Sequence, residues 1–144
     1  MKNKTDDLRI INTQELMSPQ EIIDSISPTD KGLATIVNTR MDIKNILNKS
    51  LNKFMIVVGP CSIHDIEAAL EYADRLKRLS SSLSDNCLII MRVYFEKPRT
   101  VIGWKGLIND PDLDGSFKIN KGIRLARQLL IDLSEMEIPC GHEF

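Results

Sequence analysis

The sequence lacks a surplus of either charge, because 19 lysines and arginines stand against 20 aspartates and glutamates. A protein that binds duplex nucleic acid normally carries a positive surplus, so we expect no nucleic-acid partner. No apolar stretch approaches the roughly 18 residues needed to cross a bilayer, so we expect no association with a membrane. The first ten residues have no apolar core before a cleavage site, which is not the pattern of a secretory signal.

Cysteine is also scarce. Cys61, Cys87 and Cys140 are widely spaced and odd in number, which argues against a disulfide framework. We therefore expect a reducing, cytoplasmic setting, with Cys87 and Cys140 at core positions of strands. The rest of the composition, 42% hydrophobic and 27% charged, is that of a globular domain or a piece of one.

The first third of the chain carries helix signals. Residues 1–16 are polar and predict an extended arm. The pair Ser18 and Glu21 matches a capping box, which predicts a short helix over about 18–26. A longer helix is expected to open at Asp30, because apolar residues then recur mostly at helical spacing.

The pattern then changes to strands that alternate with helices. The uninterrupted apolar run 54–58 predicts a strand buried on both faces, as in a parallel sheet. A second strand is expected to run from 87–91 into 93–95, and a third begins at Ile138. Asp65 and Asn120 are placed to cap the helices between them. This alternation predicts an α/β fold with parallel strands.

Polar residues follow the strands at the edge where parallel α/β folds place their active sites. Cys61 could hold a divalent transition metal as a thiolate, or it could be an inert free cysteine. Arg92 lies inside an apolar strand, where an unpaired charge is costly to bury. Either a carboxylate side chain pairs with it, or it faces an anion-binding site. Together with Lys97, Arg99 and Lys105 it suggests a phosphate or carboxylate pocket, and the alternative is a solvated basic loop.

Weaker signals lie nearby. His64 and His142 could act as acid–base groups or ligands, although a surface histidine is the commoner case. Trp104 is expected to anchor the long loop rather than to line a pocket. The alternating aspartates of 110–114 lack the glutamate at the twelfth position of a calcium loop, so we expect no calcium site there.

Three long strings make the sequence recognisable: GPCSIHD at 59–65, MRVYFEKPRT at 91–100 and GWKGLINDP at 103–111. They resemble the 3-deoxy-D-arabino-heptulosonate 7-phosphate (DAHP) synthases of the microbial type I class. The string TDDLRI at 5–10 also resembles the arm of that family. The resemblance covers the chain from about residue 5 to its end.

The resemblance implies an α/β fold, the N-terminal part of a (β/α)8 TIM barrel, preceded by a helical extension. Residues 1–53 would form the arm and extension that contact other subunits and the effector. Residues 54–144 would form the first three β units. Because a whole barrel takes about 250 residues, and because the third strand has no helix after it, we expect a truncated barrel.

The implied activity is that of a transferase. It condenses phosphoenolpyruvate with erythrose 4-phosphate and water to give DAHP and phosphate, the first step of the shikimate pathway to the aromatic amino acids. The implied partners are these two substrates, an aromatic amino acid as feedback effector and further copies of the chain in a homo-oligomer. The implied cofactor is a divalent metal cation. The sequence indicates neither which metal nor which amino acid.

The resemblance also assigns site residues. Cys61 would be a metal ligand, and Arg92, Lys97 and Glu143 would lie at the phosphoenolpyruvate site, with Lys97 in a catalytic role. The residues implied for the remaining roles are Lys97, Pro98, Arg99 and Thr100 for erythrose 4-phosphate, and Asp6 and Asp7 for the effector site and subunit contacts.

We expect this chain to be inactive alone, because the other metal ligands and substrate contacts of the family fall beyond Phe144. An alternative hypothesis is a non-catalytic remnant or interaction module that binds intact synthase subunits through the arm and first helices. A third is a small, complete α/β domain that binds phosphate.

Overall fold

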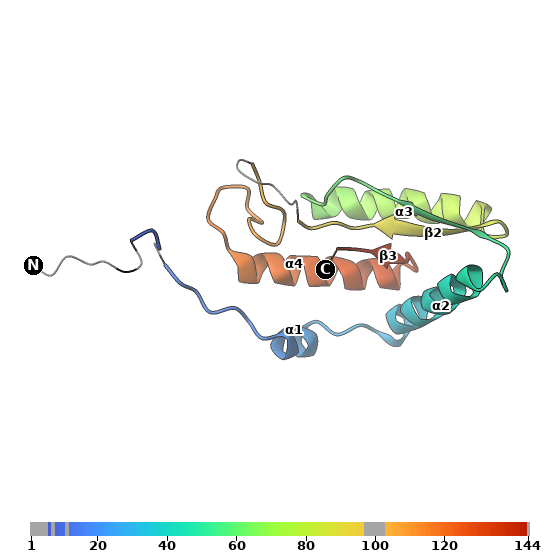
Figure 1. The fold of residues 1–144 in the computed structure, drawn as a ribbon, viewed down its shortest axis with the longest axis horizontal. Helices are drawn as coiled ribbons and strands as arrows, with labels where there is room; N and C mark the ends of the chain where they lie inside the picture. Colours follow the sequence, from blue (N-terminus) through green and yellow to red (C-terminus); the bar gives the residue numbers. More distant parts are fainter. Residues whose placement is uncertain (1–5, 7, 11, 97–102, 144) are drawn as a thin grey trace, which may run out of the picture.

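The computed structural model describes residues 6, 8–10, 12–96 and 103–143 (Figure 1). The β1, β2 and β3 strands lie side by side in that order, and both pairings are parallel. The α/β prediction is therefore confirmed, with three adjacent parallel strands preceded by two helices. The elements in chain order are α1 (Pro19–Ser25), α2 (Asp30–Leu47), β1 (Phe54–Val58), α3 (Ile66–Ser82), β2 (Cys87–Arg92), α4 (Ile119–Glu135) and β3 (Cys140–Gly141).

The core lies between β2 and the two helices that follow the first two strands. Alternate residues of a strand share one face. The side chains of Ile89 and Met91 in β2 lie on the face that α3 and α4 cover. They pack there against Ala73, Leu129 and Leu133, all of them fully buried. This packing fixes β2 as the central strand and sets the position of its carboxyl end.

The prediction that β1 is buried on both faces is wrong. All five residues are exposed, from 77% at Phe54 to 38% at Val58. The reason is that, within the described part of the chain, β1 pairs only with β2, and the α3 and α4 layer packs mainly on β2. Strand formation followed from the β-branched apolar run, whereas burial depends on what other segments pack against that run.

Three predicted helix starts are confirmed. In the capping box before α1, Glu21 N donates to Ser18 Oγ at 3.3 Å and Ser18 N donates to Glu21 Oε2 at 2.7 Å. The α2 helix opens at Asp30, with Thr29 as its N-cap. The α3 helix is capped by Asp65, as predicted. Each signal is local in sequence, so no tertiary contact was needed to identify it.

Asn120 does not cap α4, which is a correction to the sequence prediction. The helix begins at Ile119, with Lys118 at the N-cap position and no side-chain cap. The Asn120 side chain instead accepts a hydrogen bond from Met17 N at 2.9 Å and donates one to Glu15 O at 3.0 Å. Further along α4, Arg127 Nε donates a hydrogen bond to Ile26 O. These bonds hold residues 15–26 along α4.

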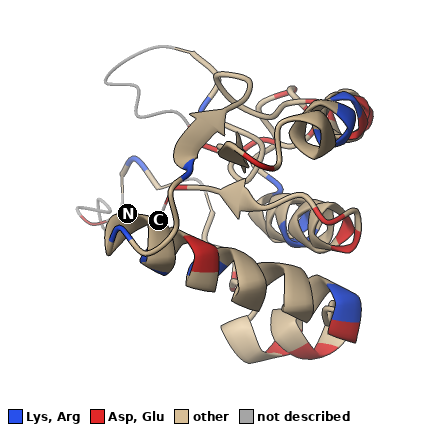
Figure 2. Ribbon diagram, turned by 90° about the vertical axis from the view of Figure 1, so that its right-hand side faces the viewer, with Lys and Arg blue, Asp and Glu red and all other residues tan. Residues whose placement is uncertain are grey.

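Charges of both signs are interspersed on the helices (Figure 2). Glu137, directly after α4, contacts Lys77 of α3 at 2.9 Å and Lys31 of α2 at 3.6 Å. The hydrogen bond from Lys77, followed by the charge of Lys31, lowers the pKa of Glu137. Among the described helices, none combines the length and apolar character needed to cross a bilayer.

Candidate substrate site at the strand ends

The carboxyl ends of the three strands converge, as their parallel order predicts. Arg92 Nη2 donates to the Cys61 carbonyl oxygen at 3.0 Å, and Ile63 N donates to Tyr94 O at 2.7 Å. These two bonds attach the loop after β1 to the end of β2. The Arg92 backbone also pairs with Gly141 of β3. A single edge of the sheet therefore carries the polar residues that follow all three strands.

Arg92 is half-buried, and its guanidinium lies 4.1 Å from the centroid of the Tyr94 ring. Its Nε atom is buried and has no hydrogen-bond partner. Within the described residues, no carboxylate forms an ion pair with it. Of the two alternatives raised by the sequence, this geometry favours an anion over a carboxylate partner, because a buried guanidinium N–H is left to be satisfied.

Sequence reasoning missed Tyr94. Residues two apart in an extended chain share a face, so Tyr94 could have been found from its spacing to Arg92. The ring supports the planar guanidinium by a cation–π contact. Sequence reasoning also gave no role to Gly59, where a Cβ atom would lie 2.5 Å from Arg92 O. Glycine is needed there for the close approach of the two strand ends.

Glu143 follows β3 and reaches across to the chain that follows β2. Its Oε1 atom accepts hydrogen bonds from Phe95 N and Glu96 N, both at 2.6 Å. Its Oε2 atom is buried without a partner. The structure therefore brings Glu143 beside the chain that follows β2, and Gly141, two residues before Glu143, is in register with Arg92.

Cys61 is exposed at the end of β1. In the described part of the chain, no three His, Cys, Asp or Glu side chains gather in a way that could hold a metal ion. One thiolate does not make a metal site, which takes three or four protein ligands. The described residues thus offer one candidate ligand and do not themselves form the site.

Cys61 and Cys140 are expected to differ sharply in reactivity. Burial raises the pKa of the Cys140 thiol to about 12, whereas Cys61 is exposed. Since the thiolate is the reactive form, a disulfide reagent at pH 8 should modify Cys61 first and Cys140 only after unfolding. Peptide mass spectrometry of the labelled chain checks this. Labelling of Cys140 as fast as Cys61 in the folded chain would contradict it.

Of the other predicted site residues, two are described and five lie outside the described part of the chain. Asp6 is exposed. The described residues that precede residue 15 extend away from the strands (Figure 1). Lys105 is half-buried in the loop before α4. The predicted residues that lie outside the described part of the chain are Asp7, Lys97, Pro98, Arg99 and Thr100.

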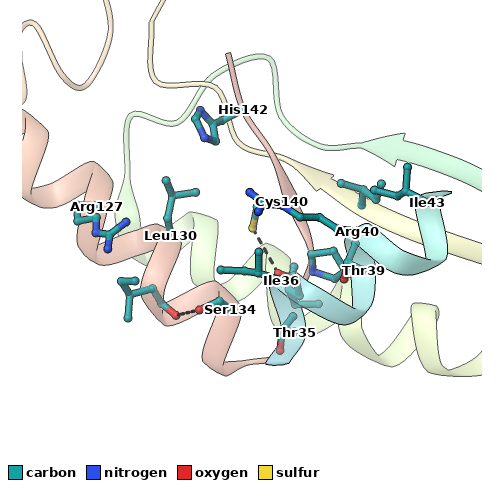
Figure 3. A pocket seen from close by; sticks show the side chains of 14 residues that line it. Thr35, Ile36, Thr39, Arg40, Ile43, Arg127, Leu130, Ser134, Cys140 and His142 are labelled. Atoms are coloured by element: carbon teal, nitrogen blue, oxygen red, sulfur yellow. Dashed lines mark hydrogen bonds between the residues drawn. The ribbon is translucent and has the colours of Figure 1, made fainter. Parts of the chain in front are cut away.

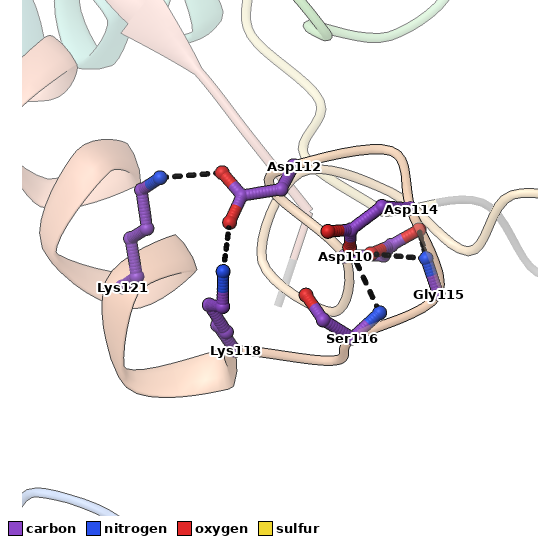
Figure 4. Close-up of polar contacts among 7 residues, drawn as sticks. All are labelled: Asp110, Asp112, Asp114, Gly115, Ser116, Lys118 and Lys121. Atoms are coloured by element: carbon purple, nitrogen blue, oxygen red, sulfur yellow. Dashed lines mark hydrogen bonds and ion pairs between the residues drawn. The ribbon is translucent and has the colours of Figure 1, made fainter.

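The loop before α4 is fixed by its own polar contacts (Figure 4). Trp104 Nε1 donates to Asp110 O at 2.8 Å, which confirms that it anchors the loop. Contrary to the prediction, it also lines a cavity, together with Leu113 and Phe117. Asp112 pairs with Lys118 at 2.7 Å and with Lys121. These two hydrogen bonds lower the pKa of Asp112. The other two aspartates of the alternating series accept backbone N–H groups, so each carboxylate is engaged within the loop.

A cavity of about 380 Å³ lies between α2, α4 and β3 (Figure 3). Its lining is mostly aliphatic, with Arg40, Arg127 and His142 among the polar residues. Neither Cys61 nor Arg92 lines it. It is therefore separate from the strand ends of β1 and β2.

The fold and the strand-end side chains define an α/β protein with a candidate anion site at the carboxyl edge of a parallel sheet. Comparison with known proteins makes this specific. Residues 31–141 match the family model described as the DAHP synthetase I family. The chain belongs to this family, and the resemblance seen in the three sequence strings is confirmed.

Curated relatives match over nearly the whole chain. The Phe-sensitive phospho-2-dehydro-3-deoxyheptonate aldolase of Escherichia coli K12 is 47% identical over 144 residues, which is 100% of this chain and 41% of the relative. The Trp-sensitive enzyme of Buchnera aphidicola subsp. Schizaphis graminum is 47% identical over 141 residues, 98% of this chain and 40% of that protein. The chain thus spans about 40% of the length of these relatives.

A solved structure agrees with the sequence match. The phospho-2-dehydro-3-deoxyheptonate aldolase of Francisella tularensis SCHU S4 superposes with a TM-score of 0.90 at 50% identity. The superposition covers 94% of this chain and 40% of that one. The arrangement of helices and parallel strands described above is therefore shared with the solved enzyme.

Proposed function

We propose that this chain supplies the first strand units and part of the phosphoenolpyruvate site of a DAHP synthase. The reaction is the condensation of phosphoenolpyruvate with erythrose 4-phosphate and water to give DAHP and phosphate. The observation that carries the proposal is the Arg92 guanidinium at the strand ends, with a buried N–H left unpaired, in a chain of this family.

Arg92 binds an anionic group of phosphoenolpyruvate, because a guanidinium grips carboxylate and phosphate through paired N–H groups. The Tyr94 ring and the Cys61 carbonyl oxygen hold the plane of the guanidinium in place. Lys97 is proposed to neutralise charge or assist proton transfer between the two substrates. Erythrose 4-phosphate is proposed to lie against the segment 97–100, which contributes two cations.

In the proposed reaction the methylene carbon of phosphoenolpyruvate attacks the aldehyde carbon of the sugar phosphate. Water then adds to the resulting cationic carbon, and phosphate leaves. The residues of this chain bind and orient the anionic substrates, which lowers the entropic part of the barrier. Fixed cations at the strand ends also stabilise the charge that develops on the departing phosphate.

Cys61 is proposed as one thiolate ligand of a divalent metal cation. Its exposure at the end of β1 suits that role. Since the described residues do not complete a metal site, we derive no step of the reaction through the metal. The other ligands would come from residues beyond those that the structure describes.

We also propose the organisation of the longer protein. Residues 1–53 would contact other subunits in a homo-oligomer, and Asp6 and Asp7 would help bind an aromatic amino acid effector. Residues 54–144 would begin the barrel. Two relatives are named Phe-sensitive and Trp-sensitive, which supports an aromatic effector as a class. A cytoplasmic setting remains part of this proposal.

The test is a chimera in which this chain replaces the matching 144 residues of the E. coli Phe-sensitive relative. With a divalent metal added, the purified chimera is expected to form DAHP from the two substrates. This chain alone and the remainder of the relative alone serve as baselines. A folded chimera with no turnover above these baselines would contradict the proposal. Co-purification of the chain with an intact relative would then favour the interaction module.

A further inference from the structure

We propose that Glu143 is a positioning residue, whose carboxylate replaces a main-chain carbonyl and fixes the backbone of Phe95 and Glu96. The inference concerns the Oε1 atom, which accepts hydrogen bonds from both backbone N–H groups at 2.6 Å. It is distinct from any contact that the Oε2 atom makes with a substrate. The consequence for catalysis rests on the proposed function, whereas the geometric claim does not.

The hydrogen-bond ladder between β2 and β3 shows which main-chain bond the Glu143 carboxylate replaces. Met91 N donates to Pro139 O at 2.7 Å, and Val93 N donates to Gly141 O at 2.8 Å. The bonds of a parallel ladder advance by two residues on each strand. The next step would therefore join Phe95 N to the carbonyl oxygen two residues after Gly141, which is that of Glu143.

That step is not made through the main chain. The Glu143 carbonyl oxygen lies 2.5 Å from His142 Nδ1, and β3 ends at Gly141. Phe95 N instead donates to the Glu143 carboxylate, and Glu96 N donates to the same oxygen. Successive N–H groups in an extended strand point in opposite directions. Their convergence on one oxygen shows that the chain leaves the strand geometry at this point and curls around the carboxylate.

Further contacts hold Glu96 from the other side. Glu96 forms an isolated antiparallel bridge with Gly106, and Asn109 Nδ2 donates to Glu96 Oε1 at 3.1 Å. Glu96 is thus held between the Glu143 carboxylate, which follows β3, and the loop that leads to α4. Glu96 directly precedes Lys97 in the sequence, so the carboxylate fixes the last described residue before the segment of proposed substrate contacts.

Amide hydrogen exchange of the 144-residue chain, followed by NMR, tests this without any catalytic assay. Glu143→Ala removes the acceptor, and exchange at Phe95 and Glu96 is expected to rise about tenfold or more. Glu143→Gln keeps an oxygen at the same reach, so exchange there is expected to stay within about threefold of the parent. The amides of Val93 and Ile63, which donate to main-chain carbonyls, serve as internal controls, and their exchange rates are expected to stay unchanged.

Three outcomes overturn the proposal. The first is unchanged exchange at Phe95 and Glu96 in Glu143→Ala, and the second is failure of Glu143→Gln to retain protection. The third is an equal rise at Val93 and Ile63, which would mean a general loss of stability. If Glu143→Ala does not fold, Glu143→Asp provides the comparison with Glu143→Gln, because its carboxylate is one methylene too short. Protection equal in the Asp and Gln variants would then overturn the proposal. An inactive chimera would leave the exchange result intact, so the two proposals fail separately.

Discussion

Arg92→Ala, made in the chimera with the E. coli relative, is expected to lower kcat/KM for phosphoenolpyruvate by roughly 100- to 1,000-fold. Removing the guanidinium takes away a charge-assisted contact at a site where an N–H is already desolvated. Arg92→Lys keeps the charge but loses the planar fork that lies over Tyr94, so an intermediate loss is expected. Steady-state kinetics with each substrate varied in turn measures both.

The matched control is Arg78→Ala on α3. Arg78 is exposed and pairs with Asp74 one turn earlier, a kind of surface pair that contributes little. Its removal is expected to leave kcat/KM within about twofold. A loss of less than threefold in Arg92→Ala would contradict the proposed contact, provided that the variant melts within a few degrees of the parent chimera. A loss of similar size in both variants would contradict it as well.

The parts of the fold that follow from local chemistry were accessible from the sequence. The capping box of Ser18 and Glu21 and the cap at Asp65 each depend on residues three positions apart. The strands follow from apolar, β-branched runs bounded by polar residues. The convergence of Cys61, Arg92 and Glu143 then follows from parallel order alone, because such strands present their carboxyl ends at one edge.

The parts that failed depend on contacts between distant segments. The burial of β1 could not be deduced from its composition, since exposure is decided by the segments that cover it. Asn120 looks like a helix cap, yet its partners are backbone groups more than 100 residues earlier. Nor could the sequence show that the Glu143 carboxylate binds backbone N–H groups, because backbone partners leave no pattern in the side chains.

Gly106→Ala is expected to destabilise the chain by about 3 kcal/mol or more. Its φ of +122° lies in a region that is nearly restricted to glycine, which accounts for about 1–3 kcal/mol. A Cβ atom would collide with the Phe95 carbonyl oxygen and lie 2.6 Å from the Glu96 Cα, which adds about 1–3 kcal/mol. The neighbours are backbone atoms held by Glu143, so they cannot move aside without breaking those bonds.

Gly115→Ala is the control that separates the cost of the collision at residue 106 from the cost of a positive φ alone. Gly115 also has a positive φ, +74°, but no atom lies within 4 Å of a Cβ built there. Its replacement is therefore expected to destabilise by only about 1 kcal/mol, the cost of a left-handed alanine. Urea unfolding followed by circular dichroism should lower the midpoint by roughly 1.5 M in Gly106→Ala and by about 0.5 M in Gly115→Ala, for a slope near 2 kcal/mol/M. Equal shifts in the two variants would show that the collision with Phe95 and Glu96 is relieved, and that this part of the backbone is less firmly held than the Glu143 contacts imply.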